Sequence, residues 1–382
     1  MTLRHLCIST LTAAALLPLA GSCAKIETGT LTAEQEIIYT LPPVKASTKA
    51  TTLTPFDQNE TFGSRAYKLA SGKKWRDDYS DGEIYIQDSE ISYDQSDGKW
   101  RVSGGQRYYW RHDGSSLTFL SWAPYTFGDD ASSLVSSSNL KIDDTSHEFT
   151  YTGWKMSATA GYGYTKDNDG NYSRNTNDGS VDLLLAKSSD RTSNDSAAGV
   201  TTEFVHQLCN VRVLATIMDE PTAGEEWHVT KVELSDIYTK ANLLRGATTD
   251  IKTGIWGGWS DTATYTYDTS SSPIGLTYTD PNTEVEIFPR TLMLPQSVLT
   301  VNSTASTRSP RIKIYYNDQN GDAKTLEGLL ASNTVIDLTT WLAAKSITYH
   351  IYLSTVDYWI EFSASTTDWE DGSEQTIIIG SN

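Results

Sequence analysis

The chain has 382 residues, a formal net charge of −18 and an aromatic content of 10%. Its length is enough for two domains that each bury a hydrophobic core. The aromatic content argues against a disordered chain. The acidic balance, with no basic patch, argues against a nucleic-acid-binding protein. Tyr, Trp, Thr and Ser are abundant, a mixture typical of strands joined by polar loops.

The N-terminus has the pattern of a secretory signal. A basic start is followed by an apolar run from Leu6 to Ala20, which is too short to span a membrane. Small residues then precede Cys23, an order similar to the bacterial lipobox, in which the Cys is acylated and becomes the first residue. We expect residues 1–22 to be a signal peptide and Cys23 to be a lipid anchor. A plain signal peptide with an unmodified Cys is the alternative.

Short strands are expected along the rest of the chain. The first is Glu36–Leu41, which ends at two prolines. Two later strand pairs read as hairpins, and Val211–Ile217 shows the period-2 alternation of a half-buried strand. Strands without intervening helical patterns predict an all-β sandwich architecture. The other expected strands are Leu117–Trp122, Val181–Ala186, Ile312–Tyr316, Ile347–Leu353 and Tyr358–Ala364.

The domain boundary is weakly marked in the sequence. Residues Asp250–Tyr265 are rich in Gly, Trp and Thr and read as irregular. We therefore expect the two domains to join near residue 245.

Few residues carry the patterns of catalytic or metal chemistry. No two His of the mature chain share a metal-ligand spacing, and no nucleophile elbow or phosphate-binding Gly loop occurs. Cys209 reads as a buried thiol on a strand. We expect no metal, no cofactor and no enzymatic activity. A secreted glycosidase stays open as a third hypothesis, because sequence cannot pair carboxylates on separate strands.

Aromatic side chains are the remaining candidates for ligand binding. Trp256 and Trp259 would stack on sugar rings if they are exposed on a β face. Ordinary core and cross-strand packing is the alternative.

Several segments, in this order along the chain, resemble the fimbrillin family of Bacteroidetes, the Mfa-like subunits of type V pili. They follow the lipobox and the early strand, and they are Ser47–Thr51, Phe62-Gly63, Leu117–Tyr125, Asp182–Ala186, Phe204–Val211, Leu292–Gln296 and Thr367–Gly372. The resemblance implies two tandem transthyretin-like Greek-key β-sandwich domains. We expect them over residues 50–245 and 246–382, after a lipidated propeptide over residues 23–49 that holds the first strand.

The resemblance also implies assembly by strand exchange. A protease would cut after Lys49, leaving Ala50 as the new N-terminus; the family's usual Arg is absent there, and Arg65 is the alternative. The removed strand would take away an apolar face made by Ile37, Tyr39 and Leu41. A strand from the C-terminus of a neighbouring subunit, here Glu374–Ile379 with Ile377 and Ile379 as its apolar contacts, would replace it.

These observations predict a structural subunit of a surface pilus that supports adhesion. It would be exported as a lipoprotein to the outer membrane and would join the fimbrium after processing. Its partners would be other pilin subunits, the protease, the membrane, and host or bacterial surface glycans or proteins. A pilus anchor subunit that is never cut and a surface lipoprotein that binds glycans through exposed Trp and Tyr are the alternatives.

Overall fold

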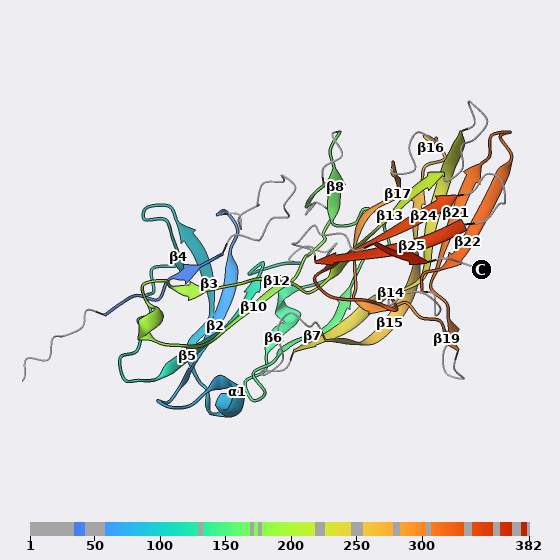
Figure 1. Cartoon of the computed structure of the whole chain (residues 1–382). Helices are drawn as coiled ribbons and strands as arrows, with labels where there is room; N and C mark the ends of the chain where they lie inside the picture. The colour runs from blue at the N-terminus through green and yellow to red at the C-terminus, as the bar shows by residue number, and fades with distance from the viewer. Residues whose placement is uncertain are drawn as a thin grey trace, which may run out of the picture. The chain divides into compact units, whose positions relative to one another are not determined.

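The computed structural model in Figure 1 describes residues 34–42, 58–128, 133–168, 172–174, 178–217, 226–245, 255–277, 283–302, 307–331, 338–353, 360–368 and 376–379. Over these residues almost every element is a strand, which confirms the all-β prediction. The helical elements of this part are short: α1 (Trp75–Asp78) and the 3-10 turns η1 (Tyr79–Asp81), η2 (Ser137–Asn139) and η3 (Ser193–Asp195). None of the described helices is long and apolar enough to cross a membrane.

The first sheet has eight strands in the order β11-β1-β4-β3-β2-β5-β10-β12. Figure 1 shows β2, β3 and β5 side by side in its blue and cyan part. Every residue of β5 is buried, so both faces of this strand are covered. The strands are β1 (Tyr39–Thr40), β2 (Phe62–Leu69), β3 (Glu83–Asp94), β4 (Lys99–Val102), β5 (Ser116–Ala123), β10 (Leu184–Arg191), β11 (Val200–Thr201) and β12 (Val205–His206).

This sheet curls around an apolar cluster that it builds from its own residues. Three strands separate β1 from β5 in the sheet, which would place them about 19 Å apart if the sheet were flat. The rings of Tyr39 in β1 and Phe119 in β5 nevertheless lie 5.9 Å apart. The sheet therefore bends round on itself, and the first strand closes the cluster on one side.

Two further sheets form a sandwich, mostly from strands that follow residue 208. One has the order β17-β13-β24-β25-β26, with β13 (Cys209–Ile217), β17 (Val285–Met293), β24 (Lys345–Leu353), β25 (Ile360–Asp368) and β26 (Thr376–Ile379). The other has seven strands, with β6 (Leu140–Ile142), β7 (Phe149–Lys155), β14 (Trp227–Arg245), β15 (Trp256–Asp268), β16 (Ile274–Leu276), β21 (Arg311–Asn317) and β22 (Ala323–Leu329).

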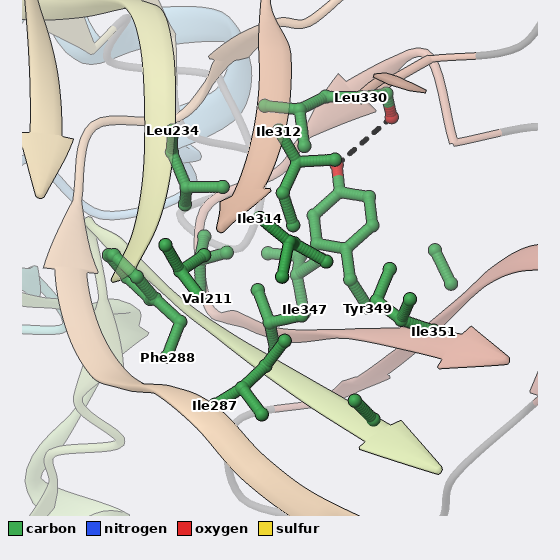
Figure 2. Close-up of a cluster of buried hydrophobic side chains, with 14 of the residues drawn as sticks. Val211, Leu234, Ile287, Phe288, Ile312, Ile314, Leu330, Ile347, Tyr349 and Ile351 are labelled. Atoms are coloured by element: carbon green, nitrogen blue, oxygen red, sulfur yellow. Dashed lines mark hydrogen bonds between the residues drawn. The ribbon is translucent and has the colours of Figure 1, made fainter. Parts of the chain in front are cut away.

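The core of this sandwich draws side chains from both sheets (Figure 2). Val211 and Ile347 enter it from the first of these sheets, and Ile312 and Ile314 from the second. The buried phenol of Tyr349 donates to the Leu330 carbonyl at 3.1 Å, which satisfies both polar groups inside the core.

The alternation read in Val211–Ile217 is confirmed. Val211, Val213, Ala215 and Ile217 are all fully buried, as a strand with one apolar face requires. Cys209 at the start of the same strand is also fully buried, and burial raises the pKa of its thiol above the usual range. The expected buried thiol on a strand is therefore confirmed for this residue.

Both expected hairpins have the predicted pairing. β21 pairs antiparallel with β22, and β24 pairs antiparallel with β25 from Lys345–Asp368 to Leu353–Ile360. The residues that join β24 to β25 lie outside the described residues.

The irregular segment expected over Asp250–Tyr265 is wrong from Trp256 onward. Residues Trp256–Asp268 form β15, which pairs antiparallel along β14 with two irregularities in register. β14 also pairs with β7 near one end and with β21 near the other, so this strand is shared by segments on both sides of residue 245. The boundary at residue 245 and the Greek-key connectivity stay predictions.

Three small strand pairs complete the described structure. They are β8 (Tyr164–Lys166) with β9 (Tyr172–Arg174), β18 (Gln296–Ser297) with β23 (Thr340–Trp341), and β19 (Val301–Asn302) with β20 (Thr307–Arg308).

Candidate assembly site at the first strand

The first strand is held on both of its edges by segments distant in sequence. On one edge Tyr39 lies antiparallel to Trp100 of β4, and on the other it lies parallel to Val200 of β11. The residues before β1 extend the first edge, where the Ile37 N–H donates to the Tyr108 carbonyl at 2.8 Å. The strand is therefore an inserted element, although it is short.

Backbone hydrogen bonds fix the register of this insertion. The Trp110 N–H donates to the Gln35 carbonyl at 2.8 Å on one side. On the other side the Val200 N–H donates to the Ile38 carbonyl at 2.8 Å and the Thr202 N–H to the Thr40 carbonyl at 2.9 Å. Removal of the strand would leave these donors and acceptors as two facing, unpaired edges.

The side chains of the strand alternate between the cluster and the surface. Ile37 and Tyr39 are 2% and 3% exposed, and Leu41 is half-buried against the same cluster. The ring of Tyr39 meets Phe62 edge-on at 5.5 Å and Phe119 at 5.9 Å. Burial raises the pKa of the Tyr39 phenol above its usual range, so the side chain is neutral at physiological pH.

We call this place the first-strand slot. Its edges are residues 100, 108–110 and 198–202, and its floor is Phe62 and Phe119. Burying each apolar side chain of the strand in it is worth about 1.5–3 kcal/mol. A vacated slot would therefore expose both an apolar floor and two strand edges.

A charged pair lies at the entrance of the slot. The carboxylate of Glu36 is 2.8 Å from Arg107 Nε and 3.7 Å from Arg101 Nη1. Arg101 also faces Asp94 and Asp97, whereas Glu36 is the one carboxylate within ion-pair distance of Arg107 in the part of the chain that is described. No local pattern marks the Glu36–Arg107 pair, because its two members lie far apart along the chain.

Gly199 lets the neighbouring segment approach the strand closely. It has a φ of +73°, and a Cβ there would lie 2.9 Å from the Ile38 carbonyl oxygen and 3.0 Å from Thr40 Oγ1. Gly179 has the same φ of +73°, but a Cβ there would meet nothing within 4 Å. Substitutions at both glycines would cause the same backbone strain, but only a side chain at Gly199 would also press on the first strand.

G199A is expected to destabilise the chain more than G179A. Both substitutions impose the left-handed backbone on a residue with a Cβ, at about 1–2 kcal/mol, and only G199A also pushes against Ile38 and Thr40. Hydrogen exchange should show the amides of Val200 and Thr202 losing protection in G199A and keeping it in G179A. Equal exchange in the two variants would contradict a tightly held first strand.

The structure places the other predicted residues as follows. Cys23, Lys49 and Ala50 lie outside the described residues. Ile377 and Ile379 lie in β26, which pairs with β25 at the edge of the five-stranded sheet, with Ile377 opposite Ala364. They are not brought to the first-strand slot of their own chain.

Arg65, the alternative cleavage residue, lies in β2, which has β3 and β5 on its two sides. It is 5% exposed, and its guanidinium pairs with Asp88 and Asp144. A protease cannot reach this peptide bond while the sheet is folded.

Of the two candidate aromatic residues, Trp256 is not exposed. It is 5% exposed, and its indole N–H donates to the Gln207 carbonyl at 2.7 Å. The core-packing alternative therefore holds for Trp256, whose ring packs against Trp154 and is not available to stack on a sugar. Trp259 is 41% exposed and stacks on Tyr238, and its contact with glycans stays a prediction.

A serine, a histidine and a glutamate are linked by hydrogen bonds in the same sequence as in a hydrolytic triad. Ser365 Oγ is 3.0 Å from His350 Nε2, and His350 Nδ1 is 2.6 Å from a Glu284 carboxylate oxygen. Ser365 is 1% exposed and lies between β24 and β26, so its hydroxyl is closed to a substrate. Among the described residues no group of His, Cys, Asp and Glu comes together as a metal site. The absence of enzymatic activity stays a prediction.

Comparisons with known proteins agree with this fold. No curated protein matches the sequence. A fimbrial protein from Bacteroides vulgatus has a solved structure with a TM-score of 0.58 and 17% identity, over 88% of this chain and 99% of that one. A protein from Bacteroides uniformis that is described as a cell adhesion protein has a TM-score of 0.41 and 15% identity, over 88% of this chain and 99% of that one. A tip fimbrial protein from Porphyromonas gingivalis has a solved structure with a TM-score of 0.34 and 11% identity, over 81% of this chain and 94% of that one.

The family model described as fimbrillin-like matches residues 48–369, which is most of the chain. The match begins after the first strand and ends before β26. The chain therefore belongs to the fimbrillin-like family.

Proposed function

We propose that this protein is a structural subunit of a surface pilus and that subunits join by exchange of the first strand. The observation that carries the proposal is the first-strand slot. A segment close to the N-terminus fills a place between two sheet edges, and its Ile37 and Tyr39 are buried there. Such a segment can be removed by one cut and replaced by another extended strand.

Replacement follows from the physics of the vacated slot. Facing strand edges and an apolar floor bind a new strand through main-chain hydrogen bonds and buried side chains. A strand supplied by the next subunit makes a heterologous contact, and repetition of that contact builds an open fibre. The C-terminal segment that ends in β26 is the donor in this proposal.

The N-terminal events complete the proposal. Cys23 would be acylated and would hold the precursor on the outer membrane. A cut after Lys49 would free the remainder of the chain from both the lipid and the first strand. The protein would act in the fimbrium at the cell surface, with other pilin subunits as its partners and no catalytic activity.

Mass spectrometry of the N-terminus tests the processing step. Polymer sheared from the cell surface is expected to begin at Ala50, whereas membrane-bound precursor should begin at acylated Cys23. K49A should leave the precursor uncut and abolish the polymer, while K45A, in the same segment, should be processed normally. Acylated Cys23 in all the material, with no polymer, would contradict the shaft-subunit role and favour an anchor subunit.

A further inference from the structure

Trp259 is an exposed tryptophan in a chain that buries its other tryptophans. Its side chain is 41% exposed, whereas the other tryptophans of the described residues are at most 9% exposed. It lies in β15, which pairs along β14 (Figure 1). Single exposed apolar side chains are common on protein surfaces, and what sets this one apart is how firmly its ring is held.

Two contacts fix the ring of Trp259. Its indole N–H donates to the Pro295 carbonyl at 3.2 Å. Its ring stacks on Tyr238, with the ring centroids 6.5 Å apart and the planes 29° from parallel. The Arg308 guanidinium lies over the ring of Tyr238, with Cζ 4.1 Å from the centroid. The exposed ring is therefore oriented before a ligand arrives, so binding does not have to order it.

The buried end of this stack is held from several sides. Arg308 is 3% exposed, and its Nε donates to the Asp236 carbonyl at 2.7 Å. Its two terminal nitrogens donate to the Ser297 carbonyl at 2.7 Å and to Gln296 Oε1 at 2.8 Å. The guanidinium therefore cannot turn without breaking buried hydrogen bonds, and the two aromatic rings rest on a fixed base.

Beside the ring, two glycines leave the surface of β15 open. A Cβ at Gly257 would meet nothing within 4 Å, and the backbone there is outside the left-handed region, so the fold does not require a glycine. A glycine inside a strand often marks a place where another molecule approaches the backbone. Gly258 has a φ of +61°, and a Cβ there would lie 2.8 Å from Asn242 Nδ2. Because Asn242 Oδ1 accepts from the Gly153 N–H at 2.8 Å, the amide nitrogen is turned toward the glycines.

We propose that Trp259, Gly257 and Asn242 form a binding site for a neutral pyranose sugar of a surface glycan. The C–H face of the sugar would pack on the open face of the indole, whose π electrons carry partial negative charge. The next sugar ring would lie over Gly257, and Asn242 Nδ2 would donate to one of its hydroxyls. This inference goes beyond the proposed function and does not depend on strand exchange.

The surroundings of the ring favour a neutral glycan over an acidic one or a protein strand. Lys240 lies opposite Ser260 and Asp261 follows, so the charges next to Trp259 are of opposite sign. The net charge of −18 repels acidic sugars. The indole N–H is engaged by Pro295, which leaves the ring face as the contact. The two irregularities in the pairing of β15 make its edge a poor template for an added strand.

A glycan array probed with the purified full chain tests the site. The array carries neutral oligosaccharides of glucose, galactose and mannose, and acidic ones that contain sialic or glucuronic acid. The unaltered chain should bind neutral glycans, and W259A should weaken this binding at least about tenfold. W259F, which keeps an aromatic face, should lose less. L342A removes another exposed apolar side chain, 54% exposed, and should bind as the unaltered chain does.

G257T is a second variant that does not depend on loss of the ring. Its side chain would enter the open space beside Trp259 and obstruct the second sugar, so binding should fall although the indole is intact. Thr suits a strand better than Gly does, so thermal unfolding should show a chain at least as stable as the unaltered one. Circular dichroism of W259A checks that its loss of binding is not a loss of folding.

The array gives outcomes that support or overturn the site. Binding of neutral glycans that W259A and G257T weaken and L342A preserves supports the proposal. Neutral glycan binding that persists in W259A would place the site elsewhere and overturn the proposal. Binding of acidic glycans alone, or of no glycan by the unaltered chain, would also overturn it. None of these results bears on whether subunits polymerise, which sheared material tests separately.

Discussion

F62A is expected to lower the free energy of unfolding of the first sheet by about 3–5 kcal/mol, as do other truncations of a buried Phe. Phe62 is completely buried at the floor of the first-strand slot. Its ring is 5.5 Å from Tyr39, 5.7 Å from Trp100 and 5.3 Å from Phe204. Loss of the ring would leave a cavity that β1 and β4 share.

The effect should be confined to one part of the chain. Unfolding in urea, followed by hydrogen exchange at single amides, distinguishes the stability of the first sheet from that of the sandwich. A single overall unfolding curve would not distinguish them. F288A is the matched control, because Phe288 is equally buried but lies in the other core. We expect F62A to expose amides of β2 and β5 first, and F288A those of β13 and β17.

A double substitution tests whether Phe62 and Tyr39 pack on each other in the first-strand slot. A double substitution with Y39A should be less harmful than the sum of the two single changes, because the two rings contact each other. Strict additivity would contradict the packing of the first strand on Phe62. A loss below about 1 kcal/mol for F62A alone would contradict the close packing of Phe62 in this cluster.

The strands with one apolar face were predictable from the sequence alone. In β13 the buried Val211, Val213 and Ala215 alternate with half-buried residues, because one face of the strand is buried. The hairpin of β24 and β25 was equally clear, because the two strands follow each other along the chain and both alternate in polarity. Local patterns of this kind need no knowledge of distant segments.

β15 was not predictable for the opposite reason. Most of its residues are exposed or half-buried, so no period-2 apolar pattern marks it, and Gly257 and Gly258 read as a loop. It is held by its pairing with β14 rather than by a buried face of its own. The same pairing turns Trp256 inward, which is why the exposure of this ring could not be inferred from its neighbours.

The first-strand slot was predictable in part. The strand and its apolar face at Ile37 and Tyr39 followed from residue order and from the family resemblance. The edges that receive it did not, because Trp100 and Val200 are about 60 and 160 residues away. Only the folded sheet shows that a short N-terminal segment lies between them.

I377D is expected to abolish polymer while leaving export and the cut after Lys49 intact. With the donor strand in the first-strand slot, the new carboxylate would lie among apolar side chains of the kind that bury Ile37, which is 2% exposed. Burying an unpaired charge there would cost at least about 3 kcal/mol, which weakens binding of the donor more than about a hundredfold. The expected material is soluble, processed monomer.

I378D is the matched control for this substitution. It adds the same charge one residue away, on the opposite face of the strand, which a donor would turn away from the apolar floor of the slot. We expect I378D to polymerise, with at most a modest loss. Electron microscopy and gel filtration of sheared material, together with circular dichroism of the monomers, distinguish loss of assembly from loss of folding.

The pair of variants decides which face of the donor enters the slot. Polymer from I377D and none from I378D would mean that the C-terminal segment binds with its opposite face, which a register shifted by one residue would produce. Polymer from both would mean that this segment is not the donor at all. Loss of polymer in I377D alone, with a folded and correctly cut monomer, is the result that the proposed strand exchange requires.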